Sequence, residues 1–257
     1  MKITLIQSNP VWEAPAVNLA RAGELVREAD ADLVVFPEMF STGFSMNAAA
    51  VADTMDGPGP QAMREMAARH GKAVMGSLAI AEGGRFFNRM FLATPDGALR
   101  HYDKRHLFRM SDENGVYTPG HERPVWEYMG VRMLPAVCYD LRFPVWLRNR
   151  GDYDMIVVAA AWPAPRAEVW RTLLRARAIE NLCYVAGVNR TGDDPNTHYN
   201  GDTALIDFLG NPVASATGRD EQAVSGVMDL AAQRAFREKF PAWMDADDFK
   251  LIMNYKL

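Results

Sequence analysis

The chain has 257 residues, of which 49% are hydrophobic and 23% are charged, and its 28 basic and 32 acidic side chains give a formal charge of −4. This composition is typical of a globular protein and argues against disordered, collagen-like and simple coiled-coil chains. The slightly acidic balance argues against nucleic acid and acidic membranes as partners, because both require a basic face.

Short apolar runs and helical patterns alternate along the chain. The expected elements are a strand over 2–7, a helix over 18–29, a strand over 33–36, a helix over 61–70, strands over 73–80, 86–93, 99–102 and 132–137, a helix over 145–150, a strand over 155–160, a helix over 170–181, and strands over 184–188, 203–207 and 223–228. Turn signals at 83–84 and 95–97 make the three strands from 73 to 102 consecutive hairpins. No linker or repeat divides the chain, so we expect one α/β domain with two layers of sheet over residues 1–230.

Residues 231–257 have a different character, being polar with widely spaced aromatic side chains. A tail of this kind can pack across a partner subunit. Docking on its own domain is an equally compatible interpretation.

The two cysteines, Cys138 and Cys183, are too few for a disulfide framework or a structural zinc site. They can form one bridge at most, and we expect free thiols in a reducing compartment. Polar residues from Gln7 onward interrupt the first apolar run before a signal peptide could form. Apolar runs such as 156–162 are far shorter than the ~20 residues that span a bilayer. We therefore expect a cytoplasmic protein that does not associate with membranes.

Three segments place a titratable side chain directly after a strand pattern. In the first, Glu38 follows the apolar run 34–36 and Pro37. Active sites in α/β proteins form where strands end, and partial burial there suits a general base. In the second, Lys104 lies in the basic cluster 101–108, where a fixed ammonium can stabilise developing negative charge. The alternatives are a Glu solvated in a loop and a solvated basic surface.

The third segment ends an apolar strand with Cys138, just before a helix start. Backbone N–H groups at such a turn lower the pKa of a thiol and can form an oxyanion hole. A structural buried cysteine is the alternative. Cys183, surrounded by apolar strand residues, fits that structural role better.

Glu38, Lys104 and Cys138, in this order and context, resemble the catalytic triad of the nitrilase superfamily, the carbon–nitrogen hydrolases. The matching motifs are Phe-Pro-Glu over 36–38, Tyr-Asp-Lys-Arg-His-Leu-Phe over 102–108, Cys-Tyr-Asp-Leu-Arg-Phe-Pro over 138–144, and further segments over 175–181, 201–203 and 209–212. The resemblance covers roughly residues 1–230. It implies a single-domain four-layer α-β-β-α sandwich that forms a homodimer, with the tail 231–257 contributing to the interface.

The resemblance also implies the roles of these residues. Cys138 is the expected nucleophile, Glu38 the general base, and Lys104 with the backbone N–H of Tyr139 the oxyanion hole. Glu113 stands in the place of the family's second glutamate, upstream of a Pro-Gly turn, where it would orient the substrate amide or hold Lys104. Glu122 is the nearby competitor, but it follows that turn.

No metal or organic cofactor is expected for this chemistry. The five histidines show no metal-ligand spacing such as H-E-x-x-H. A nucleotide-binding α/β protein is also excluded, because neither G-x-G-x-x-G nor a P-loop occurs.

The sequence around Cys138 resembles the amidase branch of the superfamily rather than true nitrilases, and the chain is most similar to bacterial omega-amidases. Such enzymes hydrolyse the terminal amide of 2-oxoglutaramate or 2-oxosuccinamate to the 2-oxo acid and ammonia. The carboxylate of these substrates needs a cation, for which Arg142 and Arg166 are candidates. An ion pair of Arg142 with Asp140 or another acid is the alternative. The candidate walls of the substrate pocket are Phe40, Phe44 and Trp162.

Two other functions fit the same residues. One is another carbon–nitrogen hydrolase, which cleaves N-carbamoyl amino acids or aliphatic amides. The other is an inactive binding or redox-sensing protein on the same scaffold. All three triad residues are present, whereas an inactive relative is expected to lose at least one of them.

Overall fold

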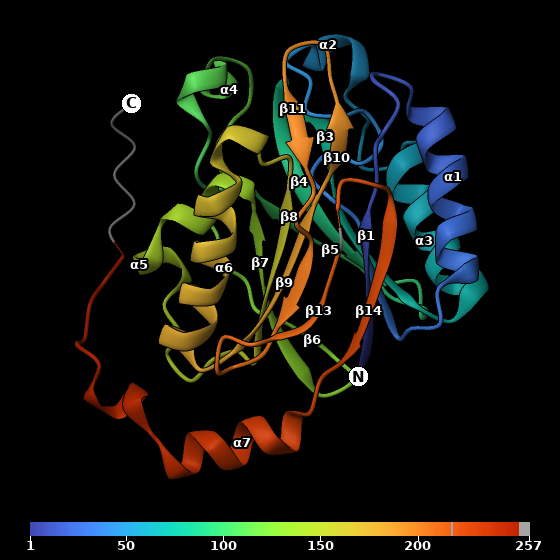
Figure 1. The fold of residues 1–257 in the computed structure, drawn as a ribbon. Coiled ribbons are helices and arrows are strands. Elements are labelled where there is room, and N and C mark those ends of the chain that lie inside the picture. The colour runs from blue at the N-terminus through green and yellow to red at the C-terminus, as the bar shows by residue number, and fades with distance from the viewer. Residues whose placement is uncertain (217, 252–257) are drawn as a thin grey trace.

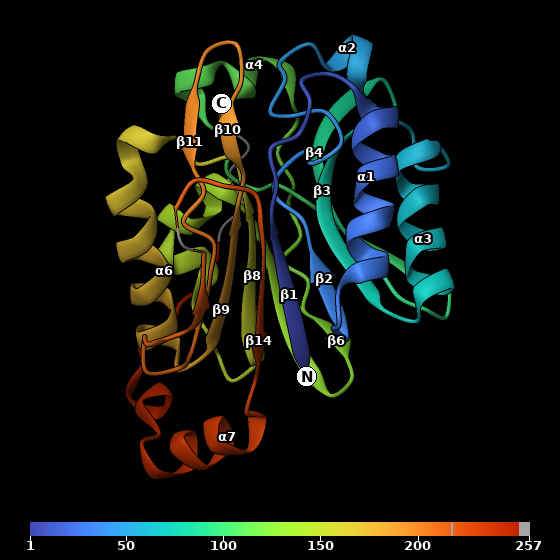
Figure 2. The same cartoon turned by 45° about the vertical axis from the view of Figure 1, so that its right-hand side comes forward.

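The structure is a computed structural model that describes residues 1–216 and 218–251 (Figure 1). Two six-stranded sheets pack face to face, and helices cover their outer faces (Figure 2). The predicted four-layer α-β-β-α sandwich is therefore confirmed. Residues 252–257, the end of the predicted tail, lie outside the described residues.

Each sheet has a parallel centre and antiparallel edges. The first sheet has the order β14 (Gln222–Val227), β1 (Lys2–Gln7), β2 (Leu33–Val35), β3 (Ala73–Glu82), β4 (Arg85–Ala93) and β5 (Leu99–Asp103). The second has the order β13 (Pro212–Ser215), β12 (Ala204–Ile206), β9 (Tyr184–Asn189), β8 (Met155–Ala160), β7 (Val131–Val137) and β6 (Trp126–Tyr128). Strands β1, β2 and β3 are parallel, as are β7, β8 and β9. A separate hairpin pairs β10 (Thr191–Asp193) with β11 (His198–Asn200).

The helices follow local signals in the sequence. They are α1 (Pro15–Glu28), α2 (Ala48–Val51), α3 (Pro58–His70), α4 (Glu113–Val116), α5 (Pro144–Leu147), α6 (Ala167–Asn181) and α7 (Leu230–Lys239). Proline at the first turn starts α1 and α3, and Gly71 in the left-handed conformation ends α3. Figure 2 shows α1 and α3 on the outer face of the first sheet and α6 on that of the second.

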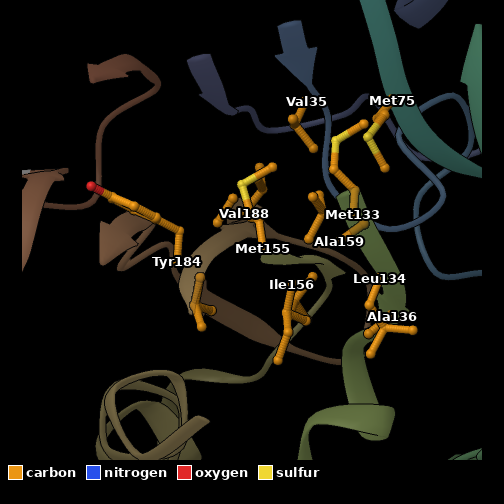
Figure 3. Packing of buried hydrophobic residues seen from close by; sticks show 14 of the residues in the cluster. Val35, Met75, Met133, Leu134, Ala136, Met155, Ile156, Ala159, Tyr184 and Val188 are labelled. Carbon is orange, nitrogen blue, oxygen red and sulfur yellow. The ribbon is translucent and has the colours of Figure 1, made fainter. Parts of the chain in front are cut away.

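The main core lies between the two sheets. Val35 and Met75 of the first sheet face Met133 and Met155 of the second, and all four side chains are fully buried (Figure 3). Because both faces of the central parallel strands are covered, these strands consist of continuous apolar runs. A second core cluster fills the space between the first sheet and helices α1 and α3.

Several predicted boundaries require correction. The helix expected over 145–150 is the short α5, because the backbone becomes extended at Arg148. The helices expected from residues 18, 61 and 170 begin three residues earlier, at Pro15, Pro58 and Ala167. The tail contains α7, whose N-terminus is capped by the Asp229 side chain accepting from the backbone N–H of Ala232. Figures 1 and 2 show α7 at the end of the sandwich opposite to α4 and the β10–β11 hairpin. No helix within residues 1–216 and 218–251 has the length and apolar character that a bilayer crossing needs.

Candidate active site

The structure brings Glu38, Lys104, Glu113 and Cys138 together at the end of the sandwich where β2, β5 and β7 finish. Lys104 follows β5 directly, and its Nζ lies 2.8 Å from Glu38 Oε1 and 2.9 Å from both carboxylate oxygens of Glu113. The three side chains are at most 1% exposed. They form a buried cluster of one ammonium and two carboxylates.

Glu38 is held by further hydrogen bonds. Its Oε1 accepts from Asn88 Nδ2 at 2.7 Å, and its Oε2 accepts from the backbone N–H of Ala161, just after β8, at 2.8 Å. The side chain is fully buried, so the alternative of a glutamate solvated in a loop is wrong. Lys104 is buried as well, and the same correction applies to the solvated basic surface at that position.

Glu113 opens the short helix α4 and fixes Lys104 from the other side. Its Oε2 also accepts from the backbone N–H of Phe108 at 2.6 Å, and its Oε1 accepts from Asn88 Nδ2 at 3.2 Å. Glu122, the competitor considered from the sequence, is exposed. Glu113 is therefore the second glutamate of the cluster.

The charges in this cluster depend on one another. Burial lowers the pKa of Lys104, but the carboxylates of Glu113 and Glu38 raise it by more, so the net effect is a raised pKa and a permanent ammonium. For Glu113, burial raises the pKa, and this outweighs the lowering by Lys104. The cluster thus supplies a fixed positive charge next to two carboxylates.

Cys138 starts the 3₁₀ turn Cys138–Arg142 directly after β7, with its own φ at +44°. Burial raises the pKa of its thiol well above the usual range, the Glu38 carboxylate raises it further, and Lys104 partly opposes this. The lowered thiol pKa expected from the sequence is therefore wrong for the resting protein. A neutral thiol beside a carboxylate needs that carboxylate as a base before it can attack.

Left-handed backbone conformations occur at or next to Glu38, Glu113 and Cys138. Besides Cys138, Met39 directly after Glu38 has φ +46°, and Asp112 directly before Glu113 has φ +58°. Such conformations cost about 1–3 kcal/mol each for a non-glycine residue and persist only where the surroundings enforce them. In this structure they occur at Cys138 itself and at the residues adjoining Glu38 and Glu113.

Cys183 differs from Cys138 in its surroundings. It lies within the main core, fully buried, and burial raises the pKa of its thiol. Its Sγ contacts the backbone oxygen of Arg177 at 3.8 Å. The sequence-based interpretation of Cys183 as a packing residue agrees with this position.

A cavity of about 640 Å³ opens onto Cys138 and Lys104. The predicted residues that line it are Phe44, Tyr139, Arg142, Trp162 and Arg166. Phe40 is not a wall of this cavity: it stacks on Phe36 at a centroid distance of 4.8 Å and belongs to the core cluster beneath α1 and α3.

Both candidate arginines, Arg142 and Arg166, line this cavity. The Cζ atom of Arg142 lies 5.1 Å from the ring centroid of Trp162, and the Cζ atom of Arg166 lies 5.0 Å from the ring centroid of Phe108. Neither side chain forms an ion pair with any residue that the structure describes. The alternative of an Arg142–Asp140 ion pair is wrong, because the carboxylate of Asp140 is bound by other groups.

Asn88 was missed by the sequence reasoning. It lies within β4, is fully buried, and its Nδ2 bridges Glu38 and Glu113. A polar residue inside an apolar strand pattern was the available signal, since a buried amide must find partners.

Comparisons with known proteins agree with this geometry. A sequence model described as carbon–nitrogen hydrolase matches residues 2–238. Omega-amidase YafV of Escherichia coli K12 is 45% identical over 253 residues, which cover 98% of each chain. The 2-oxoglutaramate amidase of Bacillus subtilis is 34% identical over 251 residues, covering 95% of this chain and 96% of that one. The crystal structure of XC1258 from Xanthomonas campestris, a CN-hydrolase superfamily protein with an arsenic adduct in its active site, superposes with a TM-score of 0.95 at 47% identity and 98% coverage of both chains.

Proposed function

The chain belongs to the carbon–nitrogen hydrolase family, the nitrilase superfamily, and we propose that it acts there as an omega-amidase. Its substrates are the monoamides of 2-oxo dicarboxylic acids, 2-oxoglutaramate and 2-oxosuccinamate, and its products are the 2-oxo acid and ammonia. The observation that carries this proposal is one cavity that combines Cys138, the buried Lys104 ammonium and the side chains of Arg142 and Arg166, which have no ionic partner within residues 1–216 and 218–251. The named activities of the two curated relatives support the same substrate class.

In the first half of the reaction, the Cys138 sulfur attacks the carbonyl carbon of the amide while Glu38 takes the thiol proton. The carbonyl oxygen becomes an oxyanion, which Lys104 and the backbone N–H of Tyr139 stabilise. Loss of one such donor typically costs about 3–4 kcal/mol of transition-state stabilisation. The proton then moves from Glu38 to the nitrogen, the carbon–nitrogen bond breaks, and ammonia leaves behind a thioester.

In the second half, Glu38 removes a proton from water, and the resulting hydroxide attacks the thioester carbonyl at the same oxyanion site. The carbon–sulfur bond breaks, the acid leaves, and the proton returns to the sulfur through Glu38. Every proton that moves is thus accounted for by one carboxylate. Glu113 orients Lys104 and does not exchange protons with the substrate in this scheme.

The substrate carboxylate lies at the far side of the cavity from Cys138, against Arg142 or Arg166. A guanidinium binds a carboxylate through two parallel hydrogen bonds, and a site that excludes bulk water strengthens them. Phe44 and Trp162 flank the chain of the substrate. The centroid of the Phe44 ring lies 5.3 Å from Lys104 Nζ, which supports this position beside the proposed reacting centre.

A homodimer is the assembly that we propose, with the tail 231–257 as part of its interface and 1–230 as the hydrolase domain. The large apolar side chains Phe240, Trp243 and Met244 are exposed in the single chain. Phe236, by contrast, packs on Phe208 with ring centroids 5.3 Å apart, so the start of the tail contacts its own domain.

A cytoplasmic location is proposed as well, because the reaction needs a free thiol and both cysteines are unpaired.

A panel of amides tests the proposed function. Ammonia release is measured for 2-oxoglutaramate, 2-oxosuccinamate, an uncharged aliphatic amide and an N-carbamoyl amino acid, which also releases carbon dioxide. The proposal expects the highest kcat/KM for the two 2-oxo acid amides. A preference for the carbamoyl or the uncharged compound would reject it in favour of another hydrolase of the same family.

A further inference from the structure

Asp140, two residues after Cys138, is a fully buried carboxylate that accepts four hydrogen bonds. Its Oδ2 accepts from the backbone N–H of Val137 at 2.9 Å and from the Tyr102 hydroxyl at 2.8 Å. Its Oδ1 accepts from the backbone N–H of His106 at 2.9 Å and from Nδ1 of the same residue at 2.7 Å. Both oxygens of the carboxylate are therefore fully engaged.

These donors flank the catalytic residues. Tyr102 and His106 lie two residues before and two residues after Lys104. Val137 directly precedes Cys138. Because β5 belongs to the first sheet and β7 to the second, this one carboxylate joins the two sheets at the point where the ammonium and the nucleophile meet.

We propose that Asp140 is a positioning residue, which holds Lys104 in register with Cys138 so that the ammonium meets the oxyanion. This inference rests on the proposed hydrolase function and adds to it a residue that does not touch the substrate. Among the residues that the structure describes, Asp140 is absent from the cavity lining, and its two oxygens accept from donors on Val137, Tyr102 and His106.

Two further contacts show how Asp140 acts through its neighbours. The bond from Val137 closes the 3₁₀ turn around Cys138, whose left-handed backbone persists only if the surroundings enforce it. The ring of His106 stacks on Phe143, the residue after this turn, with centroids 3.7 Å apart. The segment after Lys104 and the segment after Cys138 are thus held together by the carboxylate and by the ring stack.

Asp140→Asn is the variant that tests the proposal. An amide keeps the size of the carboxylate but replaces one oxygen by an NH₂ group, which would face donors instead of accepting from them. We expect kcat to fall about 10- to 100-fold, because a displacement of roughly 1 Å in a catalytic group costs that much, while KM changes little. The substrate for this comparison is any amide that the wild type hydrolyses, so an error in the proposed substrate class does not affect it.

The pH profile of Cys138 alkylation by iodoacetamide provides a readout that a structural role alone would not change. Among the charges near the thiol, Glu38 and Glu113 raise the pKa of Cys138 and Lys104 lowers it. Loss of the Asp140 charge by itself would lower the pKa of the Cys138 thiol, whereas displacement of Lys104 removes the lowering by the ammonium. A midpoint of the alkylation profile that moves to higher pH therefore reports displacement of Lys104.

Asp154→Asn is the matched control. Asp154 is also a buried carboxylate, accepting from Arg132 and Arg237, but it precedes β8 at the opposite end of the strand from the active site. The Asp154→Asn substitution should lower the melting temperature without changing kcat or the alkylation profile of the folded enzyme.

The outcomes decide the proposal. Reduced kcat with an alkylation midpoint shifted upward in Asp140→Asn, and neither change in Asp154→Asn, supports it. Wild-type kcat and profile in folded Asp140→Asn overturn it, as does an equal loss of kcat in the control. If Asp140→Asn does not fold, Tyr102→Phe, which removes one of the four donors, is expected to show a smaller shift in the same direction, and an unchanged profile there overturns the proposal.

Discussion

Lys104 Nζ donates to Glu38 Oε1 over 2.8 Å in a place where neither side chain is more than 1% exposed. The proposed oxyanion donor and the proposed base are therefore in direct contact, and the same ammonium also binds Glu113. Removing one partner of a buried ion pair typically destabilises a protein by about 3–5 kcal/mol, because the other charge stays buried without compensation. The cluster thus links catalytic geometry to the stability of the fold.

The role of Glu38 as a base is tested by Glu38→Gln, which preserves the size of the side chain. We expect kcat to fall about 10²- to 10⁴-fold, the range over which a positioned general acid–base acts. The rate of Cys138 alkylation at neutral pH shows whether Glu38 acts as a base or only as a nearby negative charge. Since the Glu38 charge raises the pKa of the thiol, its removal alone would speed alkylation, whereas loss of a base that accepts the thiol proton slows it. The account predicts slower alkylation, and faster alkylation with undiminished kcat would contradict it.

Glu113 provides a prediction about stability and pH. The pKa of Glu113 is raised in the folded chain above the usual 4.5, mainly by burial. Between pH 4.5 and this raised pKa, the folded state therefore binds more protons than the unfolded state. The stabilisation from this group is therefore complete below pH 4.5 and is lost as pH rises through the raised pKa. The free energy of unfolding of the wild type, relative to Glu113→Gln, should decrease with rising pH above 4.5. Denaturant unfolding of both proteins over a pH series measures this, and a difference that increases with pH would refute the assignment.

Recognition of the substrate carboxylate is tested by Arg142→Ala and Arg166→Ala. A hydrogen bond to a charged group contributes about 1.5–3 kcal/mol, so loss of the binding arginine should raise KM for 2-oxoglutaramate about 10- to 100-fold. KM for an uncharged aliphatic amide should stay the same. Arg148→Ala, which alters a different cavity, is the control with no expected effect. An equal rise in KM for both amides in the two test variants would reject this role.

The proposed dimer is tested by the mass of the protein in solution. We expect a mass of twice the chain's 28.7 kDa. Replacing the exposed pair Trp243 and Met244 by serine should shift the equilibrium towards the monomer, because burial of such side chains contributes about 1.5–3 kcal/mol each. A protein that is strictly monomeric and fully active would exclude the interface.

The long elements of this fold could be predicted from the sequence, and the short ones could not. Buried strands such as β8 show a continuous apolar run, which is the mark of a parallel strand covered on both faces. Three-residue strands such as β6 and β10 are too short to establish any periodicity. The predicted helices corresponding to α1 and α3 began too late, because the prolines of their first turns were assigned to the preceding loop or turn. Proline is in fact favoured in the first turn of a helix.

In the candidate site, the residues within recognisable local motifs could be predicted, and the directions of loop side chains and the contacts between distant segments could not. Glu38, Lys104 and Cys138 were identified because their local motifs resemble a known triad. Phe40 was placed in the cavity wrongly, since a loop residue after a strand has no periodicity to indicate its direction. The contacts of Asp140 could not be foreseen either, because they join residues that are 34 and 38 positions apart in the chain.

The central claim is that Cys138 forms a thioester with the acyl group of a 2-oxo acid amide. The most direct measurement is mass spectrometry of the protein quenched in acid during turnover of 2-oxoglutaramate, followed by digestion and identification of the modified peptide. The account predicts a 2-oxoglutaryl adduct on the peptide that contains Cys138, absent from the Cys183 peptide and absent in Cys138→Ser. Steady ammonia release by Cys138→Ser at the wild-type rate, with no adduct on Cys138 in the wild type, would contradict it.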